Sequence, residues 1–186
     1  MESERPSWEI VESQVVIETP HLRLRRDAIR LPGGERIEDY YVRESRGFTV
    51  VFAVTPDERV VLVRQYKHGV AESVLELPAG GIEPGEPPAF CARRELAEET
   101  GYVGDPAEPE FFGSFIFDPT SSTTRYHLYV VHDARPLEPT AFDATEDITL
   151  ELATFDDVRR YIRDGTIDVG IHIASIYYVL DRLGRL

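Results

Sequence analysis

The sequence predicts an α+β protein: an α/β/α sandwich around a mixed β-sheet, preceded by an N-terminal antiparallel β arm. Three observations support this fold class. The beginning of the 186-residue chain holds short β-type segments, two strongly apolar segments follow, and the remainder alternates between strand-like and helix-like segments. Because 42% of the residues are apolar, one good core is expected rather than two. We therefore divide the chain into an arm, residues 1–45, and a domain, residues 46–186.

The arm is predicted to contain three short strands between residues 8 and 42. A β-branched run occupies residues 15–17, polar and apolar residues alternate at 22–24, and a Pro-Gly-Gly turn occupies 32–34. These strands hold too few apolar residues to close a core alone. We expect the arm to fold together with the domain.

The strongest core signal comes from two apolar strands, residues 47–54 and 59–66, which flank the turn residues 55–58. This arrangement predicts a β-hairpin. A loop rich in Gly, Pro and Glu follows at 78–88, and helix-forming residues then run from 89 to 100. Gly101 stops that helix, because glycine readily adopts the left-handed conformation of a C-terminal cap.

The second half of the domain is predicted to begin with strands at 111–117 and 126–132. The hydroxyl-rich connection between them, 118–124, has the length of an active-site loop. A last strand is expected at 149–154. Two helices complete the domain, at 155–164 and 169–183, each followed by a glycine.

Net charge and cysteine usage exclude several functional classes. The chain has 20 Lys and Arg against 34 Asp and Glu, a net charge of −14, so nucleic-acid backbones and anionic membranes would repel it. Its single cysteine excludes an internal disulfide and a thiolate zinc site. The first eight residues lack the basic and apolar regions of a secretory signal, and no apolar run approaches about 20 residues. We expect a cytoplasmic protein without nucleic-acid or membrane partners.

Three glutamates on the helix at 89–100 carry the chemical signal. Glu95, Glu98 and Glu99 are spaced i, i+3 and i+4, which places their repelling charges on one face. Arg94 can pair with Glu98, whereas Glu95 and Glu99 lack a local basic partner. Hard oxygen ligands without nearby His or Cys select Mg²⁺ or Mn²⁺, and Mg²⁺ commonly also binds substrate phosphates. The alternative is a solvated acidic face, which is common on Glu-rich helices.

The residues around this helix resemble the Nudix box, G-x5-E-x7-R-E-U-x-E-E-x-G-U, in which U is a bulky apolar residue. Every position of the pattern is matched, by Gly80, Glu86, Arg94, Glu95, Leu96, Glu98, Glu99, Gly101 and Tyr102. With seven strict positions, a chance match is on the order of 10⁻⁶. The resemblance implies a Nudix hydrolase, which cleaves nucleoside diphosphates linked to another group and holds Mg²⁺ on a loop–helix–loop segment.

The resemblance also implies roles for the acidic residues of the box. Glu95 and Glu99 would be metal ligands, and Glu98 would be a metal ligand or would organise the water. Glu86 would add a carboxylate from the loop, unless it is merely solvated, and Arg94 would orient the glutamates by ion pairing.

The two glycines of the box, Gly80 and Gly101, are expected to adopt a positive φ, because a tight loop entry and a helix stop both favour it.

Four other segments look like the ADP-ribose pyrophosphatase branch of the family: residues 8–13, 21–24, 63–68 and 75–81. This resemblance implies hydrolysis of ADP-ribose to AMP and ribose 5-phosphate. It also implies a homodimer in which the N-terminal sheets are exchanged, so that each arm contributes to the partner's pocket. The backbone carbonyl of Ala79 would be a further metal ligand.

Several residues outside the box are candidates for substrate contact. Arg64 could bind a phosphate or the terminal ribose, or lie in solvent on an edge strand. Glu76 lies in an apolar run, where a carboxylate is costly unless it binds a ligand or forms a salt bridge. Trp8 or Tyr66 could stack on adenine or belong to the core. Arg125, at the end of the hydroxyl-rich loop, is a further candidate.

The general base is open, because the loop at 117–125 lacks the glutamate that many ADP-ribose pyrophosphatases place there. Asp118, Glu146 and Asp147 are available, and Glu146 is favoured by resemblance to relatives that act on GDP-mannose. The missing glutamate also leaves two other functions open: hydrolysis of another nucleoside diphosphate sugar, such as GDP-mannose, and non-catalytic regulation through nucleotide-sugar binding.

Overall fold

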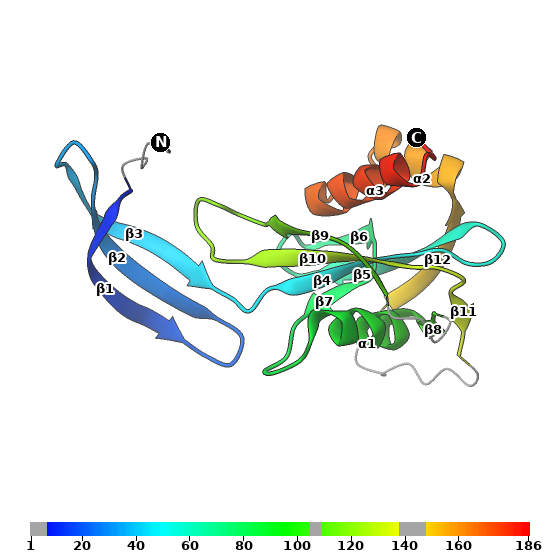
Figure 1. Cartoon of the computed structure of the whole chain (residues 1–186), viewed down its shortest axis with the longest axis horizontal. Coiled ribbons are helices and arrows are strands. Elements are labelled where there is room, and N and C mark those ends of the chain that lie inside the picture. Colours follow the sequence, from blue (N-terminus) through cyan, green and yellow to red (C-terminus); the bar gives the residue numbers. More distant parts are fainter. Residues whose placement is uncertain (1–6, 105–108, 138–147) are drawn as a thin grey trace, which may run out of the picture. The chain divides into compact units, whose positions relative to one another are not determined.

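The computed structural model describes residues 7–104, 109–137 and 148–186. The chain divides into two compact units. The N-terminal unit comprises the chain up to Arg46 together with Ile116–Arg125, and the main unit comprises Gly47–Phe115 and Tyr126–Leu186. The hydroxyl-rich loop therefore packs with the N-terminal strands. Figure 1 labels the elements of both units.

The N-terminal unit is an antiparallel sheet of β1 (Glu9–Glu18), β2 (Arg23–Arg30) and β3 (Arg36–Glu44), in the order β1-β2-β3. This confirms the three predicted strands. The loop joins the sheet through its backbone, because the amide of Arg43 donates to the carbonyl of Ser121 at 2.8 Å. All ten residues of β1 are exposed. The sheet thus presents an uncovered edge strand.

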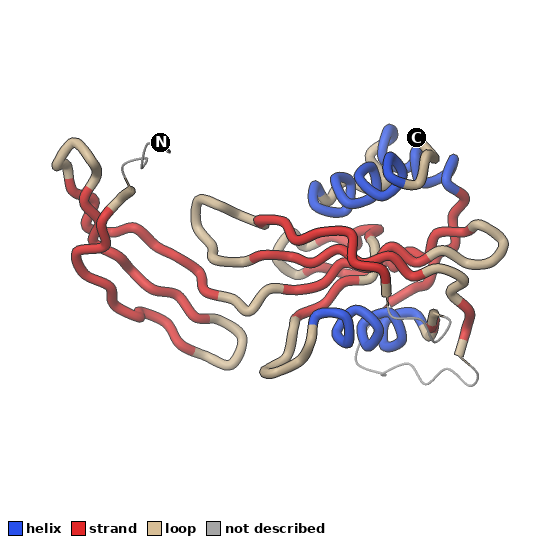
Figure 2. Tube along the Cα trace, in the orientation of Figure 1, coloured by secondary structure: helices blue, strands red, loops and turns tan. Residues whose placement is uncertain are grey.

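The remaining strands, drawn in red in Figure 2, form two larger sheets and one small one. The larger sheets have the orders β7-β4-β10-β9 and β12-β5-β6, and β11 pairs with β8. β4 pairs with β10 in parallel and with β7 antiparallel, which makes its sheet mixed. The strands are β4 (Phe48–Ala53), β5 (Arg59–Lys67), β6 (Glu72–Glu76), β7 (Ala79–Gly81), β8 (Tyr102–Val103), β9 (Glu110–Ile116), β10 (Arg125–Val131), β11 (Arg135–Pro136) and β12 (Ile148–Thr154).

The predicted hairpin between residues 47–54 and 59–66 is wrong, although both strands exist. β4 and β5 lie in different sheets and are joined only by an isolated bridge between Val54 and Val60. Each strand already has a neighbour on both of its edges: β7 and β10 beside β4, and β6 and β12 beside β5. The turn therefore carries the chain from one sheet to the other.

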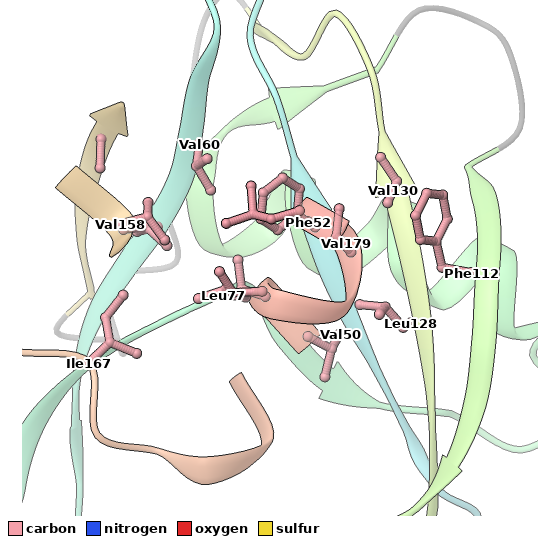
Figure 3. Close-up of a cluster of buried hydrophobic side chains, with 14 of the residues drawn as sticks. Val50, Phe52, Val60, Leu77, Phe112, Leu128, Val130, Val158, Ile167 and Val179 are labelled. Atoms are coloured by element: carbon pink, nitrogen blue, oxygen red, sulfur yellow. The ribbon is translucent and has the colours of Figure 1, made fainter. Parts of the chain in front are cut away.

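Helices cover both faces of the main unit's sheets, with α1 on one side and α2 and α3 on the other (Figure 1). The apolar run of β4 alternates between these two layers. Val50 and Phe52 pack in one cluster with Val179 of α3 (Figure 3), whereas Val51 packs in a second cluster with Leu96 of α1. Burial on both faces explains why this strand is continuously apolar.

The three predicted helices are confirmed as α1 (Pro88–Thr100), α2 (Phe155–Asp164) and α3 (Gly170–Arg182). α1 ends at Gly101, whose φ of 69° is the left-handed cap that the sequence indicates. α2 begins with a capping box between Thr154 and Asp157. Within the described residues, no helix is long and apolar enough to cross a membrane.

Candidate active site

The acidic residues of α1 and of the preceding loop converge on the guanidinium group of Arg94. It donates to both carboxylate oxygens of Glu86 at 2.8 and 3.0 Å, to Glu95 at 2.7 Å and to Glu98 at 2.9 Å. It also donates to the carbonyl of Gly81 at 3.1 Å. The expectation that Glu95 lacks a local basic partner is therefore wrong. A guanidinium presents five donors in a fork, so one arginine serves three carboxylates.

Glu86 ties the loop to the helix. Its side chain is only 6% exposed, and the hydrogen bonds from Arg94 lower its pKa to about 2. Its second interaction is local, because one carboxylate oxygen accepts from the amide of Glu83 at 2.9 Å. The charged form is thus strongly favoured, and plain solvation does not describe this residue.

Two further carboxylates of α1, those of Glu95 and Glu99, are buried. Burial raises the pKa of Glu99 to about 8, and it also raises the pKa of Glu95. The Glu99 carboxylate accepts from the amide of Ala79 at 2.9 Å, which links α1 to β7. A cation placed between such desolvated carboxylates would favour their ionised forms.

Gly80 is required for a different reason from the one predicted. A Cβ at this position would lie 1.9 Å from Cδ of Glu95, so only a residue without a side chain fits beside that carboxylate. Its φ is not among the positive values, whereas that of Gly101 is. The expectation of a positive φ is thus wrong at Gly80 and confirmed at Gly101.

The donor set fits a hard divalent cation. It consists of carboxylates of α1 beside the backbone carbonyls of β7, without an imidazole or thiolate ligand among them. Across residues 7–104, 109–137 and 148–186, no group of three Asp, Glu, His or Cys side chains is already arranged as a metal site. The reason lies in Arg94, toward which Glu86, Glu95 and Glu98 are turned.

Comparison with known protein families identifies the family to which this arrangement of residues belongs. The NUDIX domain model matches residues 44–168, two thirds of the chain, and includes the whole loop and α1. The chain belongs to the Nudix family. The model of the nucleoside diphosphate sugar hydrolase N-terminal domain matches residues 8–42, which contain β1, β2 and most of β3. The family resemblance seen in the sequence is confirmed.

Relatives extend the Nudix similarity over most of the chain. The chain is 33% identical over 159 residues to the methanol dehydrogenase activator of Bacillus methanolicus, covering 85% of this chain and 84% of that protein. It is 30% identical over 129 residues to the ADP-ribose pyrophosphatase of Bacillus subtilis, covering 66% and 68%. The crystal structure of an ADP compounds hydrolase shares the Nudix fold, with a TM-score of 0.82, 20% identity and coverage of 99% and 100%. The predicted fold is confirmed.

The predicted substrate contacts of this Nudix chain are distributed over both units. In the main unit, Arg64 of β5 lies 3.4 Å from Glu151 of β12, within a three-stranded sheet of which β5 is the central strand. In the N-terminal unit, the ring of Trp8 meets that of Tyr40 edge to face, with centroids 6.0 Å apart, and Arg125 is exposed. The edge-strand alternative for Arg64 is therefore wrong.

Of the three candidates for the general base, Glu146 and Asp147 lie outside the described residues. Asp118 already accepts hydrogen bonds within its loop, from the hydroxyl and amide of Ser121 and from the amide of Thr120. These bonds, that of the Ser121 hydroxyl first, lower the pKa of Asp118. A carboxylate so stabilised is a weaker base, which argues against Asp118 and leaves Glu146 and Asp147 as predictions.

Sequence reasoning missed one buried polar cluster next to the box. Glu76 is buried and forms a 2.5 Å ion pair with Lys67 and a 3.1 Å contact with His172 of α3. The salt bridge was one of the two alternatives for Glu76, but neither partner was identified. Lys67 lies on the neighbouring strand β5, but His172 is 96 residues from Glu76, so no spacing rule connects all three residues.

Proposed function

We propose that this protein hydrolyses the pyrophosphate bond of ADP-ribose to AMP and ribose 5-phosphate in an Mg²⁺-dependent reaction. The observation that carries the proposal is the carboxylate cluster of α1, in which Arg94 and β7 hold four glutamates beside the Ala79–Gly81 backbone. The N-terminal match to nucleoside diphosphate sugar hydrolases and the similarity to an ADP-ribose pyrophosphatase support the substrate class.

The burial of each glutamate indicates its role in the reaction. When bound, Mg²⁺ supplies positive charge to the pyrophosphate oxygens and activates water. Glu95 and Glu99, both buried, would hold the ion together with the carbonyl of Ala79, and Glu86 would support them from the loop. Glu98 is 60% exposed and is therefore accessible to orient water or complete the ligand set. Members of this family generally use divalent metal ions.

Arg94 has a positioning role in this proposal. It holds the carboxylates of Glu86, Glu95 and Glu98 together through its hydrogen bonds, and binding of the cation would require these carboxylates to turn from Arg94 toward it. Hydrolysis places the oxygen of water on one phosphorus and breaks its bond to the bridging oxygen, which leaves with the other phosphate. The proton released by water requires a base, and we assign that role to Glu146.

Substrate binding is assigned to Arg64, Glu76, Trp8 and Arg125. Arg64 offers a guanidinium for a phosphate or ribose, and the half-exposed ring of Trp8 offers a face for adenine. Glu76 would act indirectly, through the ammonium group of Lys67 with which it forms an ion pair.

We also propose that the protein is a homodimer in which the N-terminal sheets are exchanged. β1 is an edge strand that exposes apolar side chains, among them Ile10 at 55%, Val15 at 39% and Ile17 at 43%. An apolar edge of this kind favours pairing with another chain. Sedimentation velocity should give a dimer, and Val15→Glu should give a monomer with reduced turnover. A monomeric wild-type protein would contradict the exchange.

A second candidate is hydrolysis of another nucleoside diphosphate sugar, for example GDP-mannose. The absence of glutamate from the loop at 117–125 favours it. A non-catalytic regulator is less compatible with the site, because such a protein would not need to keep four carboxylates together against their mutual repulsion. Turnover of ADP-ribose, GDP-mannose, UDP-glucose, FAD and a nucleoside triphosphate distinguishes the three. Preference for ADP-ribose supports the proposal. Preference for another nucleoside diphosphate sugar supports the second candidate. Binding of a nucleotide sugar without turnover supports the non-catalytic regulator.

A further inference from the structure

Lys67 lies along the β5–β6 strand pair instead of extending into solvent. Successive residues of a strand point to opposite faces, so Lys67 shares a face with Gln65 and Val63, and Glu76 is the cross-strand partner of Val63. The ammonium group reaches back over that face, contacting Gln65 at 2.6 Å and the Glu76 carboxylate at 2.5 Å. A flexible lysine is thus held in one direction.

His172 holds the other oxygen of the Glu76 carboxylate. Its Nε2 lies 3.1 Å from that oxygen, and the two side chains are only 3% and 6% exposed. Its Nδ1 has no hydrogen-bond partner in the described part of the chain, so Nε2 provides the polar contact of the ring there. The Glu76 carboxylate therefore contacts Lys67 with one oxygen and His172 with the other.

The side chains of Lys67 and Glu76 lie on the face of their sheet that is directed toward α1, and His172 reaches Glu76 from α3. Val61, four residues before Gln65 and therefore on the same face, packs in the cluster that contains Leu96 of α1. Glu76 also lies three residues before Ala79, whose backbone amide donates to Glu99 of α1 at 2.9 Å. The side chain of Lys67 is 39% exposed.

We propose that Glu76 and His172 are positioning residues: they hold the ammonium group of Lys67 beside the carboxylates of α1, where it meets the anionic pyrophosphate of the substrate. This inference rests on the proposed function. It also gives α3 a role in the site, because His172 reaches Glu76 from the C-terminal helix. Glu76 then acts without touching the substrate.

A double-mutant cycle between His172 and Lys67 tests this positioning. We expect His172→Leu to lower kcat/KM for the nucleotide sugar by about tenfold, mainly through KM, because a donor to a charged group is lost. His172→Gln, which restores a donor near the position of Nε2, should recover most of the loss. In a Lys67→Met background, His172→Leu should have no further effect. Additive losses in the cycle, or failure of the Gln variant to recover, would overturn the inference.

A second measurement does not depend on turnover. The acetylation rate of the Lys67 amine, followed by mass spectrometry, should rise in Glu76→Gln and in His172→Leu, and unchanged rates in both variants would overturn the inference. Thermal unfolding checks that the variants fold. If His172→Leu does not fold, Glu76→Gln provides the test. A wild-type protein that hydrolyses no nucleotide sugar would reject the proposed function, while the acetylation rates still decide whether Lys67 is held.

Discussion

The Glu95 carboxylate occupies the space that a side chain at Gly80 would need. A Cβ at position 80 would lie 1.9 Å from Cδ of Glu95, inside any permitted contact distance. The candidate ligand and the glycine that begins the box are therefore one packing unit. This contact connects β7, which provides the Ala79 carbonyl, to α1, which provides the carboxylates.

Gly80→Ala should consequently displace the Glu95 carboxylate. We expect a loss of about 1 kcal/mol in the free energy of unfolding, at the low end for overpacking because the clashing atoms end a flexible side chain, together with weaker binding of Mn²⁺. Gly81→Ala is the matched control, because a Cβ there has no neighbour within 4 Å. Urea unfolding and calorimetric Mn²⁺ titration measure both effects. Equal unfolding free energies and equal Mn²⁺ affinities of Gly80→Ala and Gly81→Ala would show that the close approach of Glu95 to Gly80 affects neither stability nor metal binding.

Arg94→Met should destabilise the fold as well as the site. It leaves the largely buried carboxylates of Glu86 and Glu95 without their cation, which costs about 3 kcal/mol. Arg93→Met removes an exposed arginine from the next position of α1 and should change stability by no more than about 0.5 kcal/mol. Urea unfolding compares the two variants. Wild-type stability of Arg94→Met would contradict the role of Arg94 in neutralising the Glu86 and Glu95 carboxylates.

Glu98→Gln should abolish nearly all turnover while leaving folding unchanged. Its side chain is 60% exposed and its ion pair with Arg94 is a surface pair, worth no more than about 1 kcal/mol. Glu110→Gln changes a carboxylate of similar exposure, 58%, outside the box and should retain activity. Turnover and thermal unfolding of both variants are the measurements. Full activity of Glu98→Gln would contradict the role assigned to α1.

Stability without metal should fall as the pH rises, because of Glu99. Its pKa is raised from 4.5 to about 8, so between these values the folded state keeps a proton that the unfolded state has released. The free energy of unfolding therefore decreases across this range and the penalty is complete above about pH 8.

Glu99→Gln should remove this contribution, so that in chelator the variant gains stability relative to wild type as the pH increases. Urea unfolding with EDTA at about pH 5 and about pH 8 tests the sign. A stability difference that stays constant or reverses between the two conditions would contradict the raised pKa.

Local signals in the sequence were sufficient for the helices and the chemical residues. Gly101 and Gly165 mark helix ends through nearest neighbours, and the spacing of Glu95, Glu98 and Glu99 places them on one helix without tertiary information. The roles of these glutamates in metal binding stay predictions.

Contacts between remote segments could not be predicted in the same way. A strand buried on both faces carries no alternation, so the apolar run of β4 indicates burial but not its partner, and the hairpin was the wrong choice. The reach of Arg94 to Glu86 depends on how the loop folds back. The contact of Glu76 with His172 joins positions 96 residues apart, from β6 to α3.

The most direct test of the proposed function is product analysis of ADP-ribose incubated with the wild-type protein in Mg²⁺ and in EDTA, with Glu98→Gln alongside. The account predicts AMP and ribose 5-phosphate in equal amounts, formed with Mg²⁺ only and nearly absent with the variant. Product formation that persists in EDTA or in Glu98→Gln, or no cleavage of ADP-ribose by the wild-type protein, would contradict it.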